Sequence, residues 1–214
     1  MNEIVSEHEC KAILSIQEFL SNVNNPCLCF SGGKNSLVLL HLVQQLAPGS
    51  VTIIHVDTGA EFPAVRSYIQ KMKKLWKLDL IIEISGVNKG KGENKETCCT
   101  QYLFTPLKNI IKSRKFDGVL IGETSGSTMD ISNFLASDED SAIVLAQPLI
   151  SFTSHDIWEY IRSHNLPFCS LYEHGFLKID CEPCSFLDTS PGNESASHDD
   201  EARIKEKLKK LGYL

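Results

Sequence analysis

The stretch Pro26-Cys27-Leu28-Cys29-Phe30-Ser31-Gly32-Gly33-Lys34-Asn35-Ser36 decides the fold of this 214-residue chain. An apolar run precedes two glycines, and a second apolar run, residues 37–43, follows them. This order predicts a buried strand, a glycine turn and the start of a helix. Glycines allow the backbone to approach a ligand closely, and a helix start offers free N–H groups to an anion. We therefore expect phosphate binding, although a strand-to-helix turn without any ligand shows the same glycine pair.

Composition is typical of a soluble globular protein, with 42% hydrophobic residues, 22% charged residues and a net charge of −6. No apolar run reaches the ~20 residues of a membrane helix, and the acidic N-terminus is unlike a signal peptide. We expect a cytoplasmic protein with no membrane partner. A nucleic-acid surface is usually basic, so such contact would need a local cluster, such as residues 71–77 or 203–210, or a partner protein. Each cluster is more often a solvated face.

Apolar runs alternate with helical spacing along most of the chain. Strands are expected at 27–31, 51–56, 78–84, 117–122 and 143–145, helices at 8–21, 34–47, 62–76, 98–114, 153–163 and 199–211, and a loop at 165–197. The alternation predicts an α/β fold with a doubly wound, mainly parallel five-stranded sheet. We expect an N-terminal helix in residues 1–24, a nucleotide-binding α/β domain in 25–164, and a cysteine-containing loop and helix in 165–214 that belong to the same domain.

The strand ends should meet at one edge of this sheet. Ligands of doubly wound sheets bind beyond the carboxyl ends of the strands, where the strand order reverses. The turns Asp57-Thr58-Gly59 and Gly122-Glu123-Thr124 should therefore join residues 31–36 around one crevice. Asp57 has two open interpretations, as a ligand of Mg²⁺ or as the N-cap of the following helix. His55 lies within an apolar strand and is interpreted as a core histidine without a catalytic role.

Three ordered motifs carry a family resemblance that covers roughly residues 25–185. Residues 31–36 and 55–63 resemble the PP-loop and second-strand motif of the ATP pyrophosphatases. Residues 156–172, with Asp-Ile-Trp-Glu-Tyr-Ile, Asn-Leu-Pro and Leu-Tyr, resemble the downstream signature of the phosphoadenylyl-sulfate/adenylyl-sulfate reductase family. The resemblance implies the Rossmann-like adenine nucleotide alpha hydrolase fold. It implies nucleotide-binding roles for Ser31, Gly32, Gly33, Lys34, Asn35, Ser36, Asp57, Thr58, Gly59 and Gly122, and catalytic roles for Lys34, Ser36 and Asp57.

Eight cysteines are many for a chain expected in a reducing compartment, where structural disulfides are disfavoured. Cys27 and Cys29 alternate in a strand and are interpreted as core residues. Two further pairs can supply four thiolates to one metal centre, either zinc or iron–sulfur, or can bind no metal. The resemblance to the bacterial adenylyl-sulfate reductases implies a 4Fe–4S cluster on Cys98, Cys99, Cys181 and Cys184.

The chain departs from the reductases in three places. Asn35 stands where the family loop commonly has Asp, the turn at 122–127 lacks the family's arginines, and no cysteine follows Cys184 to act as the tail nucleophile. We therefore expect an ATP pyrophosphatase that forms AMP and pyrophosphate and activates a target for sulfur incorporation. It resembles the ATP pyrophosphatase component of DNA phosphorothioation systems.

This interpretation implies ATP and Mg²⁺ as cofactors. It also implies a sulfur donor such as a cysteine desulfurase, and DNA reached through partner proteins. Two alternatives stay open: a phosphoadenylyl-sulfate or adenylyl-sulfate reductase that uses an external thiol, and a non-catalytic subunit that senses ATP.

Overall fold

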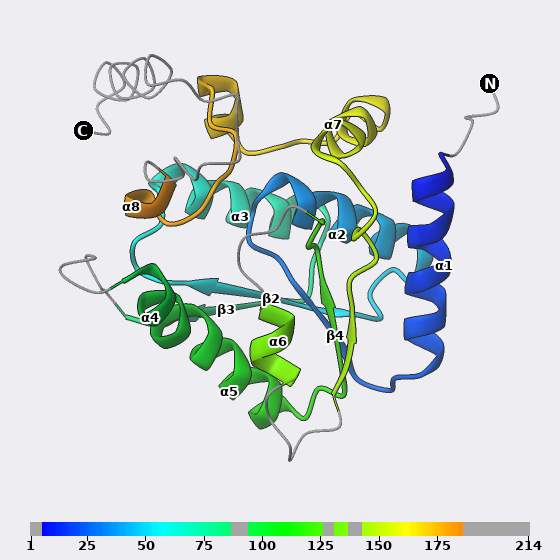
Figure 1. The fold of residues 1–214 in the computed structure, drawn as a ribbon, viewed down its shortest axis with the longest axis horizontal. Helices are drawn as coiled ribbons and strands as arrows, with labels where there is room; N and C mark the ends of the chain where they lie inside the picture. The colour runs from blue at the N-terminus through cyan, green and yellow to red at the C-terminus, as the bar shows by residue number, and fades with distance from the viewer. Residues whose placement is uncertain (1–5, 87–93, 126–130, 137–142, 186–214) are drawn as a thin grey trace.

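The computed structural model describes residues 6–86, 94–125, 131–136 and 143–185 (Figure 1). The helix expected at 199–211 and most of the glycine- and lysine-rich segment at 86–95 lie outside these ranges. None of the helices in the described ranges is long and apolar enough to cross a membrane.

Five strands form one sheet in which every described pairing is parallel. They are β1 (Pro26–Cys29), β2 (Thr52–Asp57), β3 (Leu80–Ile84), β4 (Gly118–Ile121) and β5 (Val144–Ala146), in the order β3-β2-β1-β4-β5. The predicted α/β sheet is thus confirmed. The chain moves outward from β1 to β3 and then returns to the other side of β1. The strand order therefore reverses between β1 and β4, and a ligand crevice is expected at their carboxyl ends.

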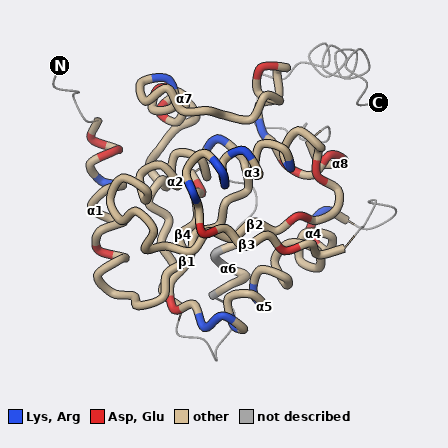
Figure 2. Tube along the Cα trace, turned by 180° about the vertical axis from the view of Figure 1, so that it is seen from behind, with Lys and Arg blue, Asp and Glu red and all other residues tan. Residues whose placement is uncertain are grey.

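Helices cover both faces of the sheet (Figure 1 and Figure 2). One face packs against α1 (Glu7–Ser21), α2 (Lys34–Leu46), α3 (Pro63–Leu75) and α7 (Ser154–Ser163), and the other against α4 (Lys95–Cys99), α5 (Thr105–Arg114) and α6 (Ile131–Ala136). Each face has its own core of fully buried side chains, such as Leu39 on the first and Ile111 on the second. Burying a side chain of this size contributes about 2 kcal/mol.

The helix expected at 98–114 begins earlier and is interrupted. It starts at Lys95, where the Asn94 side chain accepts from the Thr97 N–H at 2.8 Å. A π-helical segment, Thr100–Phe104, then separates α4 from α5. Pro106 has no N–H to donate to the carbonyl of Tyr102 four residues earlier. That carbonyl instead accepts a hydrogen bond from the Ser85 hydroxyl.

Short helices were missed by the sequence analysis. They are α6, a 3₁₀ helix at Ser170–His174 and α8 (Glu182–Ser185), the last two within the segment expected to be a loop. Segments of four to six residues hold too few turns for a helical period to show.

Thr153 caps the start of α7. The Thr153 hydroxyl accepts from the Asp156 N–H at 3.2 Å, and the Asp156 carboxylate accepts from the Thr153 N–H at 2.8 Å. This reciprocal pair is a capping box.

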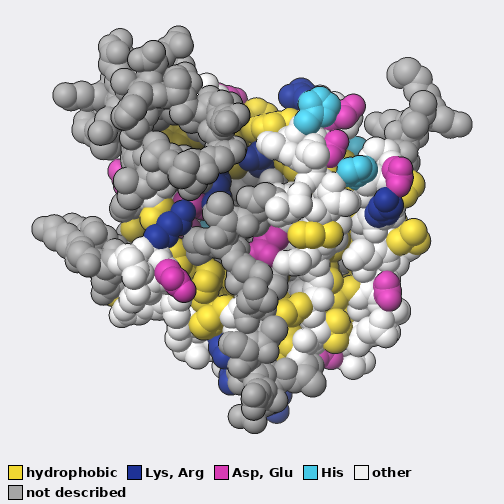
Figure 3. Space-filling view, in the orientation of Figure 1, with side chains coloured by type: hydrophobic (Ala, Val, Ile, Leu, Met, Phe, Trp, Pro, Cys, Tyr) yellow, Lys and Arg dark blue, Asp and Glu magenta, His cyan; other side chains and the backbone are white. Residues whose placement is uncertain are grey.

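Histidine and acidic side chains lie together over α7 (Figure 3).

Candidate nucleotide and cysteine site

The phosphate loop, residues 31–36, joins β1 to α2 as predicted. Gly32 has φ +80°, and a Cβ there would lie 3.2 Å from the Ile69 side chain of α3. A side chain is therefore excluded both by backbone conformation and by packing. Within the loop, the Ser31 hydroxyl accepts from the Gly33 N–H at 3.2 Å and lies 3.1 Å from the Ser36 hydroxyl. The loop's own serines thus hold the start of α2 in place.

The end of β4 lies directly against this loop. A Cβ on Gly122 would be 3.1 Å from the backbone nitrogen and Cα of Ser36. The Asn35 amide lies 3.5 Å from the Thr124 hydroxyl. The structure therefore brings together the first and fourth strand ends that the sequence placed in one crevice.

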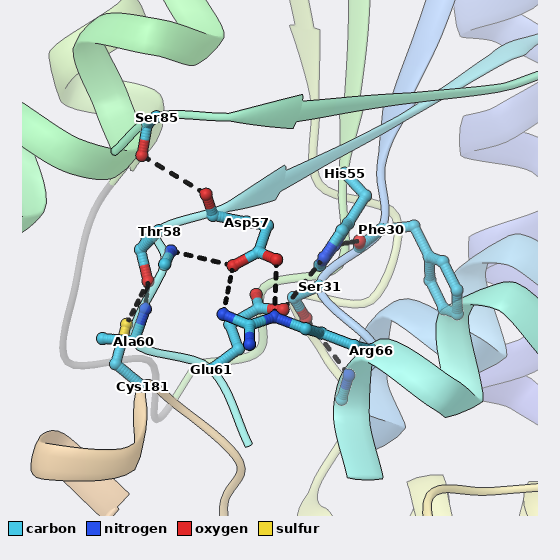
Figure 4. A network of polar contacts seen from close by, with 12 residues as sticks. Phe30, Ser31, His55, Asp57, Thr58, Ala60, Glu61, Arg66, Ser85 and Cys181 are labelled. Atoms are coloured by element: carbon cyan, nitrogen blue, oxygen red, sulfur yellow. Dashed lines mark hydrogen bonds and ion pairs between the residues drawn. The ribbon is translucent and has the colours of Figure 1, made fainter. Parts of the chain in front are cut away.

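Asp57 is held by an arginine that the sequence analysis did not single out (Figure 4). Arg66 donates to both carboxylate oxygens, at 2.7 Å from Nε and 3.1 Å from Nη2, and the Gly59 N–H donates at 2.8 Å. Burial opposes ionisation of Asp57, but Arg66 and Gly59 outweigh it and lower the pKa of this carboxyl. The N-cap interpretation of Asp57 is wrong, because the N-cap position of α3 is Phe62. Asp57 instead closes its own turn.

His55 is a buried histidine with both ring nitrogens engaged (Figure 4). Its Nδ1 lies 2.9 Å from the Phe30 carbonyl and its Nε2 lies 3.1 Å from the Glu61 carboxylate. Burial alone would lower the pKa of His55, but hydrogen bonding to Glu61 and the Glu61 charge reverse this and raise it. The prediction of a satisfied core histidine is confirmed.

The two cysteine pairs interact although more than 80 residues separate them in sequence. Burial raises the pKa of Cys99 to about 11, and the nearby Cys184 and Cys98 add to the effect. Burial also raises the pKa of Cys181 to about 12; Thr58 opposes this shift, whereas Cys184 and Cys99 reinforce it. These thiols therefore share one location, at the junction of α4 and the segment that leads into α8.

A metal site needs a particular spacing between its four thiols. Tetrahedral zinc holds each sulfur at about 2.3 Å, so its ligands lie within about 4 Å of one another. Among the described residues, the one group of three or more candidate ligands with all atoms within 4.8 Å is His155, Asp156 and Glu159 of α7, which contains no cysteine. The four thiols thus do not form such a compact group as they stand. Four thiolates at one location can hold either zinc or a 4Fe–4S cluster, which binds one thiolate at each of four irons.

Segment 170–185 connects the phosphate loop to the cysteines. This connection could not be predicted from the sequence. The Tyr172 hydroxyl accepts from the Lys34 backbone N–H at 2.8 Å, and the Lys34 ammonium donates to the Leu177 carbonyl at 2.8 Å. Burial, and then repulsion from Lys178, lowers the pKa of Lys34. Leu171-Tyr172 stood out only as part of a motif, and nothing in its residue types predicted a contact with Lys34.

The same segment then reaches the end of β2. The Cys181 sulfur lies 3.0 Å from the Thr58 hydroxyl, and the Glu182 N–H donates to the Ala60 carbonyl at 2.8 Å. The predicted nucleotide residues and the predicted metal ligands therefore lie side by side, because residues 172–184 contact the phosphate loop and the end of β2 and also contain Cys181 and Cys184.

Comparison with known proteins identifies related sequences. A family model described as the phosphoadenosine phosphosulfate reductase domain matches residues 25–187. An adenosine 5'-phosphosulfate reductase of Bacillus thuringiensis is 27% identical over 88% of this chain and 86% of its own length. One from Bacillus anthracis is 27% identical over 90% of each chain.

Solved structures share the fold. A phosphoadenylyl-sulfate reductase from Candida auris has a TM-score of 0.67 at 19% identity, covering 80% of this chain and 88% of its own. A U34-tRNA thiolase from Methanococcus maripaludis, solved with its 4Fe–4S cluster, has a TM-score of 0.58 at 13% identity, covering 97% and 80%. Because the family model spans most of the described α/β domain, the chain belongs to the phosphoadenosine phosphosulfate reductase domain family.

Proposed function

We propose that this chain binds adenylyl sulfate, with its phosphate on residues 31–36, and reduces it to sulfite and AMP. The likeness to adenosine 5'-phosphosulfate reductases along nearly the whole of both chains carries this proposal. It replaces ATP cleavage, expected from the sequence, as the first candidate. The contact between the phosphate loop and the cysteine segment supports it, because sulfur chemistry would take place beside the bound nucleotide.

The reaction requires two thiols. A thiolate attacks the sulfur of adenylyl sulfate, the S–O bond breaks, and AMP leaves with the electron pair. A second thiol then releases sulfite and forms a disulfide, so that the dithiol is oxidised as the sulfonate is reduced. Lys34 and the N–H groups at the start of α2 would stabilise the charge that develops on the AMP phosphate.

An external dithiol protein is the expected reductant. Cys98, Cys99, Cys181 and Cys184 would hold a 4Fe–4S cluster as thiolates and so would not supply the nucleophile. When bound, the cluster would fix the segment before α8 against α4 beside the nucleotide.

Turnover tests the first proposal. Protein incubated anaerobically with adenylyl sulfate and reduced thioredoxin should form sulfite and AMP in equal amounts. Lys34→Ala should lose most of this activity, whereas Lys112→Ala, on the far face, should keep it. Adenylyl sulfate that binds but yields no sulfite would reject the reductase.

Metal content tests the four-cysteine site separately. Anaerobically purified protein should contain iron and acid-labile sulfide in equal amounts, and Cys99→Ser should lose both. Cys10→Ser is the matched control, because Cys10 is exposed on α1 and should leave iron content unchanged. Colourless protein with stoichiometric zinc would overturn the cluster assignment.

One observation favours a second candidate, an ATP pyrophosphatase that activates a target for sulfur incorporation, as in DNA phosphorothioation. The turn after β4 contacts the phosphate loop through Thr124 and contains no arginine through Ser125, while the Glu123 carboxylate accepts from the Ile131 N–H at 3.2 Å and from the Gln147 amide. This turn therefore offers no guanidinium to a sulfated anion, whereas ATP can be accompanied by Mg²⁺. A Mg²⁺ ion at Asp57 would compete with Arg66 for the carboxylate oxygens. A cysteine desulfurase would be the matching sulfur donor.

The products separate the candidates. ATP with Mg²⁺ should give AMP and pyrophosphate if the second candidate holds, and release of ADP and phosphate alone would reject it. Tight nucleotide binding with no turnover of either substrate would instead indicate a subunit that senses nucleotide.

A further inference from the structure

The stretch Pro63–Lys77, which comprises α3 and two more residues, carries an unbalanced positive charge. It contains five cations and no acidic residue, so the rest of the chain carries a net charge of −11 rather than −6. Lys and Arg follow one another along α3 in Figure 2. The five cations are Arg66, Lys71, Lys73, Lys74 and Lys77.

Four of these cations face outward. α3 buries Val65, Tyr68, Ile69 and Met72 against the core, so its opposite side is exposed. Lys73 turns back and donates to the Leu80 carbonyl at 3.3 Å. Arg66, Lys71, Lys74 and Lys77 are exposed, and we call them the basic face. Among the described residues, no carboxylate pairs with Lys71, Lys74 or Lys77.

The spacing of the basic face suits a linear polyanion. Lys71 and Lys74 lie three residues apart on α3, a rise of about 4.5 Å, and Lys77 follows just beyond the end of the helix. Phosphates of one nucleic-acid strand follow at about 3.4 Å along the axis. Ser67 and Gln70 line the same open hollow as Arg66, Lys71 and Lys74, and such neutral donors commonly contact phosphate oxygens. A row of cations with neutral donors between them fits a phosphodiester backbone better than a compact acidic protein surface.

The basic face begins at the candidate site. Arg66 donates to Asp57 at 2.7 Å, and α3 packs against Gly32 of the phosphate loop through Ile69 and Val65. A nucleic-acid strand that lies along α3 would therefore end beside the bound nucleotide.

We propose that the basic face of α3 binds the phosphodiester backbone of a single-stranded nucleic acid and leads it to the phosphate loop. This deepens the second candidate function, on which its use in sulfur transfer rests, by naming the class of acceptor and the surface that holds it. Binding requires no turnover, so a failure of this surface and a failure of the ATP reaction are distinguishable.

Fluorescence anisotropy with a labelled single-stranded oligonucleotide, measured from about 50 to 200 mM salt, tests the surface. The wild-type protein should bind, with affinity falling as salt rises. Because each phosphate contact contributes about 0.7 to the salt slope of a single strand, removing three contacts should reduce the slope by about 2. Affinity at low salt should fall tenfold or more in the variant Lys71→Gln/Lys74→Gln/Lys77→Gln.

A matched control removes three cations from the end of α5 on the opposite face. Like Lys77, Lys115 has a positive φ, 56° against 50°, so the backbone contexts are comparable. Nucleotide binding and circular dichroism establish that both variants fold. The control Lys112→Gln/Arg114→Gln/Lys115→Gln should keep the wild-type affinity and salt slope.

Three outcomes would overturn the proposal. They are no oligonucleotide binding by the wild-type protein, an equal loss of affinity in both variants, and displacement of the oligonucleotide by polyglutamate of equal charge at the same concentration. The last result would indicate an acidic protein as the partner.

Discussion

Replacing Tyr172 by Phe should lower the free energy of unfolding of the nucleotide-free protein and raise its affinity for nucleotide. The Tyr172 hydroxyl accepts from the Lys34 N–H at 2.8 Å, at the helix start where the proposed phosphate would bind. A phosphate oxygen that takes this N–H must displace the hydroxyl. The phenylalanine variant has already lost that hydrogen bond, so nucleotide binding no longer has to break it.

The two effects should be equal in size and opposite in sign. A hydrogen bond of this kind contributes about 1 kcal/mol net. The free energy of unfolding should therefore fall by about 1 kcal/mol without nucleotide, and affinity should rise about fivefold. Unfolding of the saturated protein should be almost unchanged, because the same N–H then binds phosphate in both proteins. Burial raises the pKa of Tyr172, so the hydroxyl stays protonated throughout the neutral range.

Urea unfolding with and without nucleotide, together with calorimetric titration of ATP and adenylyl sulfate, measures both quantities. Tyr68→Phe is the matched control, because its buried hydroxyl donates to the Pro167 carbonyl at 2.9 Å, away from Lys34. It should lose similar stability without any gain in affinity. A Tyr172→Phe variant that binds nucleotide more weakly, or equally well despite lost stability, would refute competition at Lys34.

Three other perturbations have defined outcomes. Gly122→Ala should cost about 1–3 kcal/mol in thermal unfolding and weaken nucleotide binding, because the new Cβ meets the Ser36 backbone at 3.1 Å. Burial, and then His164, lowers the pKa of His41 from 6.5 to about 4, so the neutral ring is favoured in the fold. The free energy of unfolding should be highest above pH 6.5 and should fall by about 1–2 kcal/mol towards pH 4 after allowance for solvent screening. The melting temperature should depend less on pH over this range in His41→Gln. Arg66→Gln should cost about 1 kcal/mol at pH 6, since Arg66 is partly solvated; because the Asp57 pKa is depressed, this loss should vanish as pH falls below the ordinary carboxyl pKa of 3.8, as chemical denaturation can measure.

The sequence predicted the parts of this molecule whose signals are local. A strand, two glycines and a helix start follow one another in residues 26–43, so the phosphate loop could be found without any knowledge of distant contacts. The converging ends of β1, β2 and β4 followed from the alternation of strands and helices, because parallel strands share an edge. The adjacency of Gly122 to the loop was in this sense predictable.

What the sequence could not predict depends on contacts between distant segments. Arg66 is an ordinary exposed helix residue until β2 places Asp57 beside it. Tyr172 lies 138 residues from Lys34, in a segment with no period. Such contacts depend on the three-dimensional path of the later segments across the carboxyl edge of the sheet.

The π-helical segment between α4 and α5 has a consequence for the orientation of Cys98 and Cys99. Each α-helical residue turns the chain by about 100°, and a π turn accommodates an extra residue without lengthening the axis in proportion. Leu107, Ile110 and Ile111 fix the rotation of α5 against the sheet. The intervening Thr100–Phe104 segment therefore sets the rotational phase of the two cysteines independently of α5. α5 is fixed against the sheet, and the π-helical segment turns α4 so that Cys98 and Cys99 lie toward Cys181 and Cys184.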